Sequence, residues 1–257
     1  MTKQTKKAYA SDKITATVAS GEYFMKVDAN GKVTIISMDN LKASIIGGMN
    51  MNAIEDGIFI MFHRASDNYP LMVKPHKWAS YQSGGEIAEG VVVVEGGHIL
   101  VVAPTETALV WSSAAISGGA YTTTDRIAAM DDWAGKANTT AIINHSTSSA
   151  VTNTSSYAPG FCNNYSQVNK NGKGLTAGRW WLPSLGEMMM IYANMTKINY
   201  ALSLISGATQ LAEAAYWTST EYSATYAWFL NLYYGSASNN PKASYTGHVR
   251  PVSAFIA

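Results

Sequence analysis

A run of four consecutive valines at residues 91–94 is the strongest secondary-structure signal in the sequence. A second apolar run, from His98 to Ala103, follows them across the pair Gly96-Gly97. β-Branched side chains favour strands, and two such runs joined by two glycines predict a tight antiparallel hairpin with buried strands. The chain has 257 residues, which is enough to bury a large core around this hairpin.

Formal charge is nearly balanced, with 18 Lys and Arg residues against 17 Asp and Glu residues. The chain therefore lacks the basic excess of nucleic-acid-binding proteins and the polybasic patch that binds anionic membranes. No apolar run approaches the roughly 18 residues of a membrane span. The polar, basic residues 1–7 are followed by no apolar stretch, so we expect no signal peptide. We expect synthesis in a cytoplasm, no nucleic-acid partner and no membrane insertion.

The N-terminal residues predict a small separate module. Residues 1–20 are polar and lack periodicity, as expected of an arm that is flexible or ordered by a partner. Residues 23–27 and 32–36 are β-prone runs around an Asn-Gly turn, which predicts a hairpin. A short helix over residues 41–46 is expected next. The module is either a simple decoration or a docking module that folds on a larger assembly, and both interpretations remain open.

Two helices are expected in the larger part of the chain. One covers residues 124–145, with Gly135 as a point where it can split. The second begins at Ser184, which forms a capping box with Glu187 three residues later. Between them, residues 146–172 are rich in Ser, Thr, Asn and Gly and predict mostly loop.

The end of the chain predicts strands. A further helical run covers residues 198–205 and stops at Gly207. Residues 216–256 alternate aromatic and small polar residues, which predicts several short antiparallel strands. A loop rich in Gly, Ser, Asn and Pro is expected around residues 235–247.

The sequence shows no recognisable catalytic or metal-binding pattern. Five scattered histidines include no pair at a metal-ligand spacing, and Cys162 is the only cysteine. Asp131-Asp132 fits the charged first turn of a helix better than a catalytic dyad. Glu187 and Glu221 can in principle pair as acid and base, but capping already explains Glu187. We expect no enzymatic activity, no cofactor and no metal site.

Residues 222–248 have the composition of a binding surface. They are rich in Tyr, Ser, Asn and Thr, and Lys242 is the only formally charged residue among them. Antibody paratopes share this composition, because Tyr gives rigid amphipathic contact area and Ser and Asn give adaptable hydrogen bonds. An edge sheet in a Tyr- and Ser-rich protein would have a similar composition, so this alternative stays open.

Several short motifs, in a fixed order, carry a family resemblance. They are Gly178-Arg179-Trp180-Trp181-Leu182-Pro183-Ser184, Tyr216-Trp217-Thr218-Ser219-Thr220-Glu221 and Val249-Arg250-Pro251-Val252-Ser253-Ala254-Phe255, with Asp132-Trp133-Ala134-Gly135-Lys136-Ala137-Asn138-Thr139 upstream. Over residues 90–257 the chain resembles the variable proteins of diversity-generating retroelements, in the gut-bacterial and phage branch. The resemblance implies an α+β, C-type lectin-like fold with two helices and antiparallel sheets. It implies a lectin-like domain at 57–257, with a variable region at about 216–250, after an attachment and oligomerisation module at 1–56.

In that family, a reverse transcriptase miscopies adenines and overwrites the 3′ end of the gene. Asn codons changed in this way cannot give Lys, Glu, Gln, Met or Trp. Within residues 222–248 only Trp228 and Lys242 belong to that excluded set. The segment is therefore compatible with the mechanism, although many segments of low charge would be.

The resemblance implies which residues vary and which stay fixed. The expected variable, ligand-binding residues share one exposed face and are Tyr222, Ser223, Thr225, Tyr226, Phe229, Asn231, Tyr233, Tyr234, Ser236, Ser238, Asn239, Asn240, Ser244, Tyr245, Thr246 and His248. The expected fixed scaffold consists of Trp217, Ser219, Glu221, Trp228, Gly235, Arg250 and Pro251. Trp217 and Trp228 are expected to fill the core, and Arg250 to pair with an acid such as Glu221.

The N-terminal residues carry a second family resemblance. Residues 21–42 resemble the attachment regions of phage tail fibres. This implies a homotrimer at a tail-fibre tip of the virion, made in the bacterial host and joined to tail structural proteins through the N-terminal module. The implied target is a host cell-surface protein or glycan, bound without turnover.

Three other functions are alternatives to a phage receptor-binding protein. A calcium-dependent carbohydrate-binding lectin would carry acidic loop motifs, of which Asn240-Pro241 is the nearest fragment. A bacterial surface adhesin is disfavoured by the expected lack of a signal peptide. An enzyme of the formylglycine-generating type would need cysteines or metal ligands beyond Cys162.

Overall fold

The computed structural model describes residues 23–27, 33–37, 55–145 and 152–255. The chain divides into two compact units, Met1–Ile54 and Glu55–Ala257. The sequence placed this boundary between residues 56 and 57. The second unit combines helices with mainly antiparallel sheets, so its fold class is α+β.

An antiparallel hairpin is the described part of the first unit. β1 (Tyr23–Val27) pairs with β2 (Val33–Ser37), with Tyr23 opposite Ser37 and Val27 opposite Val33. The predicted hairpin is confirmed. The predicted arm at 1–20 and the predicted helix at 41–46 lie outside the described residues.

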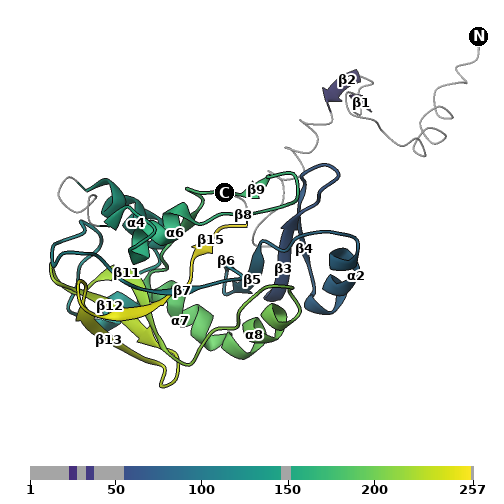
Figure 1. The fold of residues 1–257 in the computed structure, drawn as a ribbon. Helices are drawn as coiled ribbons and strands as arrows, with labels where there is room; N and C mark the ends of the chain where they lie inside the picture. The colour runs from purple at the N-terminus through teal and green to yellow at the C-terminus, as the bar shows by residue number, and fades with distance from the viewer. Residues whose placement is uncertain (1–22, 28–32, 38–54, 146–151, 256–257) are drawn as a thin grey trace, which may run out of the picture. The chain divides into compact units, whose positions relative to one another are not determined.

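A six-stranded antiparallel sheet contains the valine hairpin (Figure 1). Its strands, in spatial order, are β10 (Trp180–Trp181), β15 (Val252–Ser253), β6 (His98–Val102), β5 (Gly90–Glu95), β3 (Gly57–His63) and β4 (Pro70–Val73). Gly96 and Gly97 have φ angles of 57° and 84°, the left-handed values that a two-residue hairpin turn requires. The prediction of a tight hairpin with buried strands is confirmed, because Val91, Val92 and Val93 are fully buried.

A five-stranded sheet carries most of residues 222–248. Its strands, in spatial order, are β13 (Ser236–Pro241), β12 (Tyr226–Asn231), β11 (Ala215–Glu221), β14 (Thr246–Val249) and β7 (Thr107–Val110). β14 runs parallel to β11, so the prediction of purely antiparallel strands is wrong at this pair. The predicted loop at 235–247 is also wrong in part, because β13 is a strand. Ser and Asn disfavour strands, but six consecutive residue pairs with β12 outweigh that preference.

The described residues contain more helices than the three helical runs predicted at 124–145, from Ser184 and at 198–205. These helices are α2 (Trp78–Ser83), α3 (Arg126–Met130), α4 (Gly135–Asn144), α6 (Ala158–Asn164), α7 (Leu185–Ala193) and α8 (Met195–Ser203). The predicted run at 198–205 corresponds to α8. The predicted helix at 124–145 is split into α3 and α4, and the predicted capping box of Ser184 and Glu187 begins α7. The predicted loop at 146–172 contains α6, whose first turn holds Pro159 and whose Cys162 is buried.

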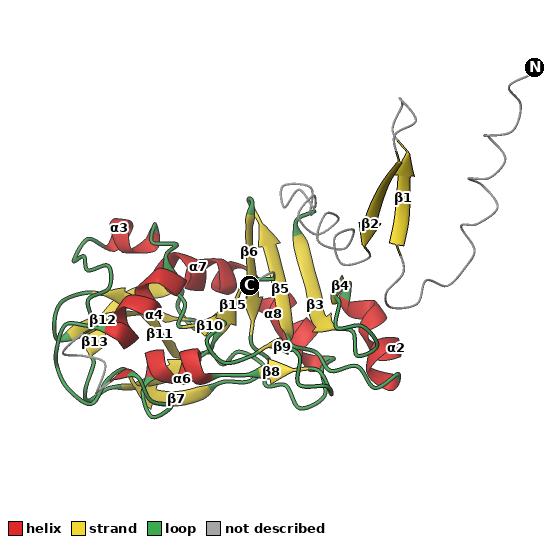
Figure 2. Ribbon diagram, turned by 90° about the horizontal axis from the view of Figure 1, so that it is seen from above, coloured by secondary structure: helices red, strands yellow, loops and turns green. Residues whose placement is uncertain are grey.

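Two hydrophobic clusters cover the two faces of the five-stranded sheet. One cluster joins this sheet to the six-stranded sheet, with α7 packed on β11 and β12 and α8 packed on β3 and β5. The other cluster includes residues of α4 and α6, which lie near β11 and β10 (Figure 2). Because side chains alternate along a strand, Trp228 belongs to the first cluster and its neighbour Ala227 to the second.

Candidate ligand-binding surface

Two tryptophans pack on opposite faces of the five-stranded sheet. Trp217 on β11 is fully buried, and its Nε1 donates to the carbonyl oxygen of Leu109 at 3.1 Å. Trp228 on β12 is 3% exposed, and its Nε1 donates to the carbonyl oxygen of Thr123 at 2.8 Å. A buried indole N–H needs such an acceptor, so these bonds fix how each ring sits in the core.

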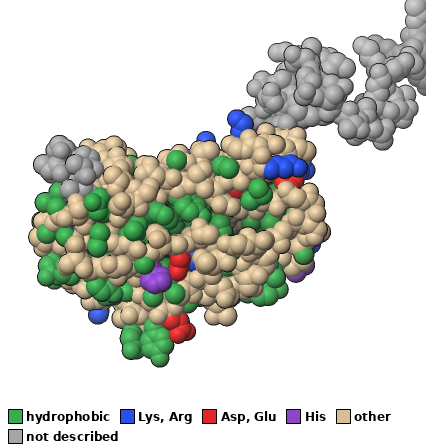
Figure 3. All heavy atoms as spheres, in the orientation of Figure 1, with side chains coloured by type: hydrophobic (Ala, Val, Ile, Leu, Met, Phe, Trp, Pro, Cys, Tyr) green, Lys and Arg blue, Asp and Glu red, His purple; other side chains and the backbone are tan. Residues whose placement is uncertain are grey.

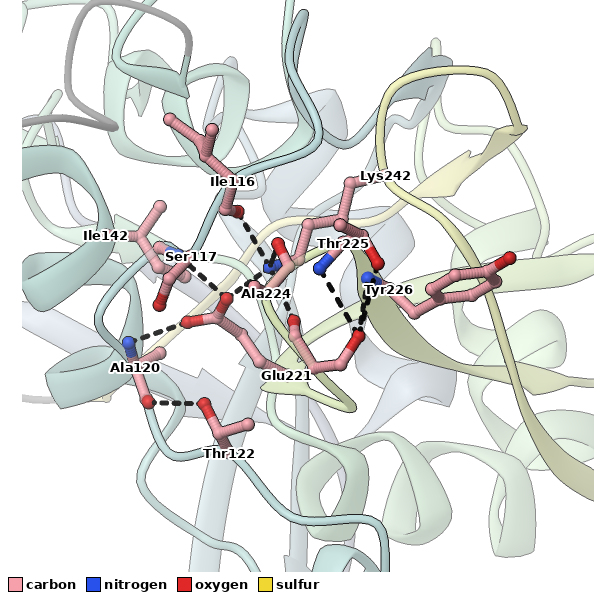
Figure 4. A network of polar contacts seen from close by, with 12 residues as sticks. Ile116, Ser117, Ala120, Thr122, Ile142, Glu221, Ala224, Thr225, Tyr226 and Lys242 are labelled. Carbon is pink, nitrogen blue, oxygen red and sulfur yellow. Dashed lines mark hydrogen bonds and ion pairs between the residues drawn. The ribbon is translucent and has the colours of Figure 1, made fainter.

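A buried ion pair joins the end of β11 to the residue that follows β13. The Glu221 carboxylate contacts Nζ of Lys242, and neither side chain is exposed. The same Nζ donates to the carbonyl oxygens of Ile116, Ser223 and Ala224, at 3.1, 3.0 and 3.0 Å (Figure 4). Burial lowers the pKa of Lys242, whereas the Glu221 carboxylate acts on that pKa in the opposite direction.

The other contacts of this pair connect two loops. The two carboxylate oxygens of Glu221 accept the backbone N–H groups of Gly118 and Ala120, each at 2.8 Å. The Lys242 ammonium also lies 4.6 Å from the ring centre of Trp111. The loop at 222–225 is therefore fixed to the loop at 116–120 by one charge pair.

Arg250 pairs with Glu106, and the predicted pairing with Glu221 is wrong. The guanidinium Nη2 lies 2.7 Å from a Glu106 oxygen, which also accepts the Tyr216 hydroxyl at 2.6 Å. The other Glu106 oxygen lies 3.0 Å from Nδ1 of His248. Burial, followed by the Glu106 carboxylate, raises the pKa of Tyr216. Glu221 is not available to Arg250, because Lys242 and two backbone N–H groups already occupy its oxygens.

The structure places the predicted scaffold and variable residues differently. Among the scaffold residues, Trp217, Ser219, Glu221, Trp228, Arg250 and Pro251 are buried and Gly235 is half-buried. None of the sixteen predicted variable residues is buried. The exposed ones are Thr225, Tyr226, Tyr233, Tyr234, Ser236, Ser238, Ser244 and Thr246. The half-buried ones are Tyr222, Ser223, Phe229, Asn231, Asn239, Asn240, Tyr245 and His248.

The turn between β12 and β13 presents two tyrosines. Tyr233 and Tyr234 are 60% and 73% exposed, and their rings meet edge to face at 4.6 Å. Oδ1 of Asn231 accepts the backbone N–H groups of both tyrosines, at 2.9 and 3.2 Å. Gly235 completes the turn with a φ of 65°, and a Cβ there would lie 2.5 Å from the Tyr192 hydroxyl. The turn is thus held by backbone-directed bonds while its aromatic rings face solvent.

The predicted variable residues do not share one face of the sheet, contrary to expectation. The Tyr222 ring lies 5.2 Å from Trp228, in the cluster between the sheets. Phe229 and Tyr245 stack at 5.9 Å on the opposite face. Consecutive residues of a strand point to opposite faces, so a continuous run such as Ser238 to Asn240 cannot face one way.

Some of these residues also hold local structure. Oγ of Ser223 accepts the backbone N–H groups of Thr225 and Tyr226, at 3.2 and 3.1 Å. Asn231 organises the tyrosine turn, and His248 contacts Glu106. The sequence could not separate such residues from freely variable ones, because Ser, Asn and His suit both roles.

Sequence reasoning missed two features of this unit. One is Glu106, which gathers Arg250, Tyr216 and His248 from over a hundred residues away in sequence. The other is Trp133, 38% exposed, whose ring stacks on His98 with centres 3.8 Å apart. Trp133 lies in the motif at 132–139, but nothing in the sequence indicated its contact with His98.

The surface of the second unit carries few charged side chains that could bind a ligand. On the face shown in Figure 3, charged side chains are sparse among hydrophobic and uncharged polar ones. Among the residues that the structure describes, no three His, Cys, Asp or Glu side chains are arranged to hold a metal ion. Burial raises the pKa of the Cys162 thiol, which disfavours the reactive thiolate. Within the described ranges, no helix has the length and apolar character that crossing a bilayer demands.

Comparison with known proteins points to a shared fold. No family model matches the chain, and no curated protein matches it. The chain is similar in structure to a fimbrial protein from Bacteroides ovatus, with a TM-score of 0.51 and 16% identity. The match covers 79% of this chain and 49% of that chain, so this chain spans about half the length of the fimbrial protein. A likeness at this identity concerns the fold alone.

Proposed function

We propose that the chain is a noncovalent receptor-binding protein that displays a retroelement-diversified surface on a C-type lectin-like fold. The observation that carries the proposal is the contrast within residues 217–250. Trp217, Trp228, Glu221 and Lys242 are buried and bonded, whereas none of the sixteen residues expected to vary is buried. Side chains at the eight exposed positions among the sixteen can change without loss of the core.

The tyrosine turn is the best candidate for the centre of the binding surface. Tyr233 and Tyr234 together expose large amphipathic rings on a turn that Asn231 and Gly235 hold in place. A turn whose backbone is already held loses little conformational entropy when a target covers it. A host cell-surface protein or glycan is the proposed target, and the chain carries out no reaction on it.

The proposed setting is the tail-fibre tip of a phage or prophage. The N-terminal module would join tail structural proteins, and three copies of the chain would raise weak single-site affinity through avidity. Light scattering on the full chain should give the mass of a homotrimer. A monomer at micromolar concentration would contradict this part of the proposal.

Binding to cells tests the proposed function directly. Labelled protein is incubated with a panel of gut bacterial strains, and bound label is measured by flow cytometry. We expect selective binding to some strains and a loss of at least about tenfold in affinity for the variant Tyr233→Ala/Tyr234→Ala. Tyr200→Ala is the matched control, since Tyr200 is 56% exposed on α8. Equal binding by both variants, or binding to no strain, would contradict the proposal.

The neighbouring DNA tests diversification separately. A reverse-transcriptase gene and a near-copy of the 3′ end of this gene are expected close by. Their absence would remove the retroelement from the proposal and leave an ordinary binding protein.

A bacterial surface adhesin is a second candidate, because the structural neighbour is called a fimbrial protein. The same surface would then face outward from a bacterial cell. Antibodies against the chain distinguish the settings: purified virions are labelled in the first case, and intact producing cells in the second.

A further inference from the structure

β13 forms an open edge of the five-stranded sheet. It pairs with β12 over all six of its residues without a register shift, and no described strand pairs with its other side. Proteins usually guard such an edge with a charged side chain, a proline, a bulge or a covering segment. The residues of β13 carry no charge, and the adjacent Lys242 is fully buried with Glu221, so it does not guard the edge. Only the terminal Pro241 interrupts the row of backbone donors.

The hydrogen bonds of β12 show which side of that strand faces which neighbour. The N–H of Leu232 donates to the carbonyl oxygen of Ala214, so even-numbered residues of this strand direct their backbone groups towards β11. The carbonyl oxygen of Thr225 accepts the N–H of Lys242, so odd-numbered residues face β13.

The outward-directed groups of β13 follow from this alternation. Ser238 and Asn240 stand opposite odd-numbered residues of β12 and bond to them. Ala237 and Asn239 therefore direct their N–H and C=O groups away from the sheet. None of these four groups has a hydrogen-bond partner among the described residues. Two donors and two acceptors thus stand in the spacing that an added strand requires.

We infer that this edge binds an extended segment of a protein target, which pairs as an extra strand beside β13. The inference rests on the proposed function and names its ligand class, a polypeptide in extended conformation. Backbone groups stay the same when side chains are replaced, so the edge would keep binding strands while the surface changes. The side chains of Ser236, Ser238 and Asn240 project from one face of β13, where they would select among segments.

The variant pair Asn239→Pro and Asn239→Ala separates backbone from side chain. Proline removes an outward N–H that the fold does not use, whereas alanine removes the side chain and keeps that N–H. Pro241 shows that β13 accepts proline at an outward-directed position. The probe is a displayed library of random linear dodecapeptides, followed by dissociation constants for the recovered synthetic peptides. We expect Asn239→Pro to weaken binding at least about tenfold and Asn239→Ala to change it less than about threefold.

Hydrogen exchange gives a second readout on the natural chain. Addition of a recovered peptide should slow exchange of the Ala237 and Asn239 amides, while the Ser238 amide, already bonded to β12, changes little. Equal affinities for both variants, unchanged exchange at Ala237 and Asn239, or β13-mediated pairing of two copies of the chain would each overturn the inference.

The outcome also separates the two proposals. A chain that binds bacterial cells or a glycan array but recovers no peptide overturns the extended-segment ligand and leaves the receptor-binding function in place. A chain that binds neither cells nor peptides contradicts both.

Discussion

Lys242 and Glu221 form an ion pair with no exposure of either side chain to solvent. Removal of one partner leaves the other charge buried and unpaired, which costs about 3–5 kcal/mol. We expect Lys242→Met to lower the free energy of unfolding by that amount in urea denaturation. The double variant Glu221→Gln/Lys242→Met removes both charges and should regain most of the loss. Lys197→Met, on the exposed side of α8, is the control and should change stability by less than about 0.5 kcal/mol.

Two features require glycine at position 235: a left-handed backbone conformation and the close approach of Tyr192. Two alanine variants separate their effects on stability. Gly235→Ala adds strain at a φ of 65° and a Cβ at 2.5 Å from the Tyr192 hydroxyl. Gly178→Ala adds a comparable strain at a φ of 83° with no atom within 4 Å. We expect about 1–2 kcal/mol of destabilisation at Gly178 and a larger value at Gly235, by thermal unfolding. Equal losses would mean that Tyr192 moves aside freely.

Glu187 should make the stability of the fold depend on pH. Its burial raises the pKa of its carboxyl from 4.5 to about 7, against hydrogen bonds from Ser184 and Trp181 that lower the pKa. Between those values the folded state holds a proton that the unfolded state has released. Stability therefore falls as pH rises from about 4.5 to about 7, by up to about 3 kcal/mol. Glu187→Gln keeps a capping side chain without this titration, so its loss of stability between pH 5 and pH 8 should be smaller.

Binding should survive chelation. Calcium requires several oxygen ligands, and Glu221, the one acidic residue in the sequence from 216 to 257, has its oxygens occupied by Lys242 and two backbone N–H groups. The measurement is binding to a recognised bacterial strain with and without excess EDTA. A large loss that added calcium reverses would favour a calcium-dependent lectin instead.

Local signals in the sequence were sufficient for the elements they governed. The valine hairpin, the capping box at Ser184 and the N-terminal hairpin each depend on neighbouring residues, and all three are confirmed. The burial of Trp217 and Trp228 was expected from the family resemblance, and both side chains are buried.

Contacts between distant residues could not be predicted in the same way. β13 is a strand because β12 pairs with it, although its own Ser and Asn residues favour a loop. Glu106 became the partner of Arg250 only through a fold that brings residues 144 positions apart into contact (250 − 106 = 144). Lys242 showed no sign in the sequence that its charge would be buried.

Residues 246–253 supply one strand to each large sheet, with β14 between β11 and β7 and β15 between β6 and β10. Neither sheet can be completed until the ribosome has released this stretch. A frameshift or stop codon introduced upstream of Thr246 would leave β7 and β10 without their neighbours, and the chain would remain open to proteases. If residues 222–245 are rewritten as proposed, a version with a shifted or interrupted reading frame would therefore lack both strands, and only versions with an intact frame could complete the two sheets.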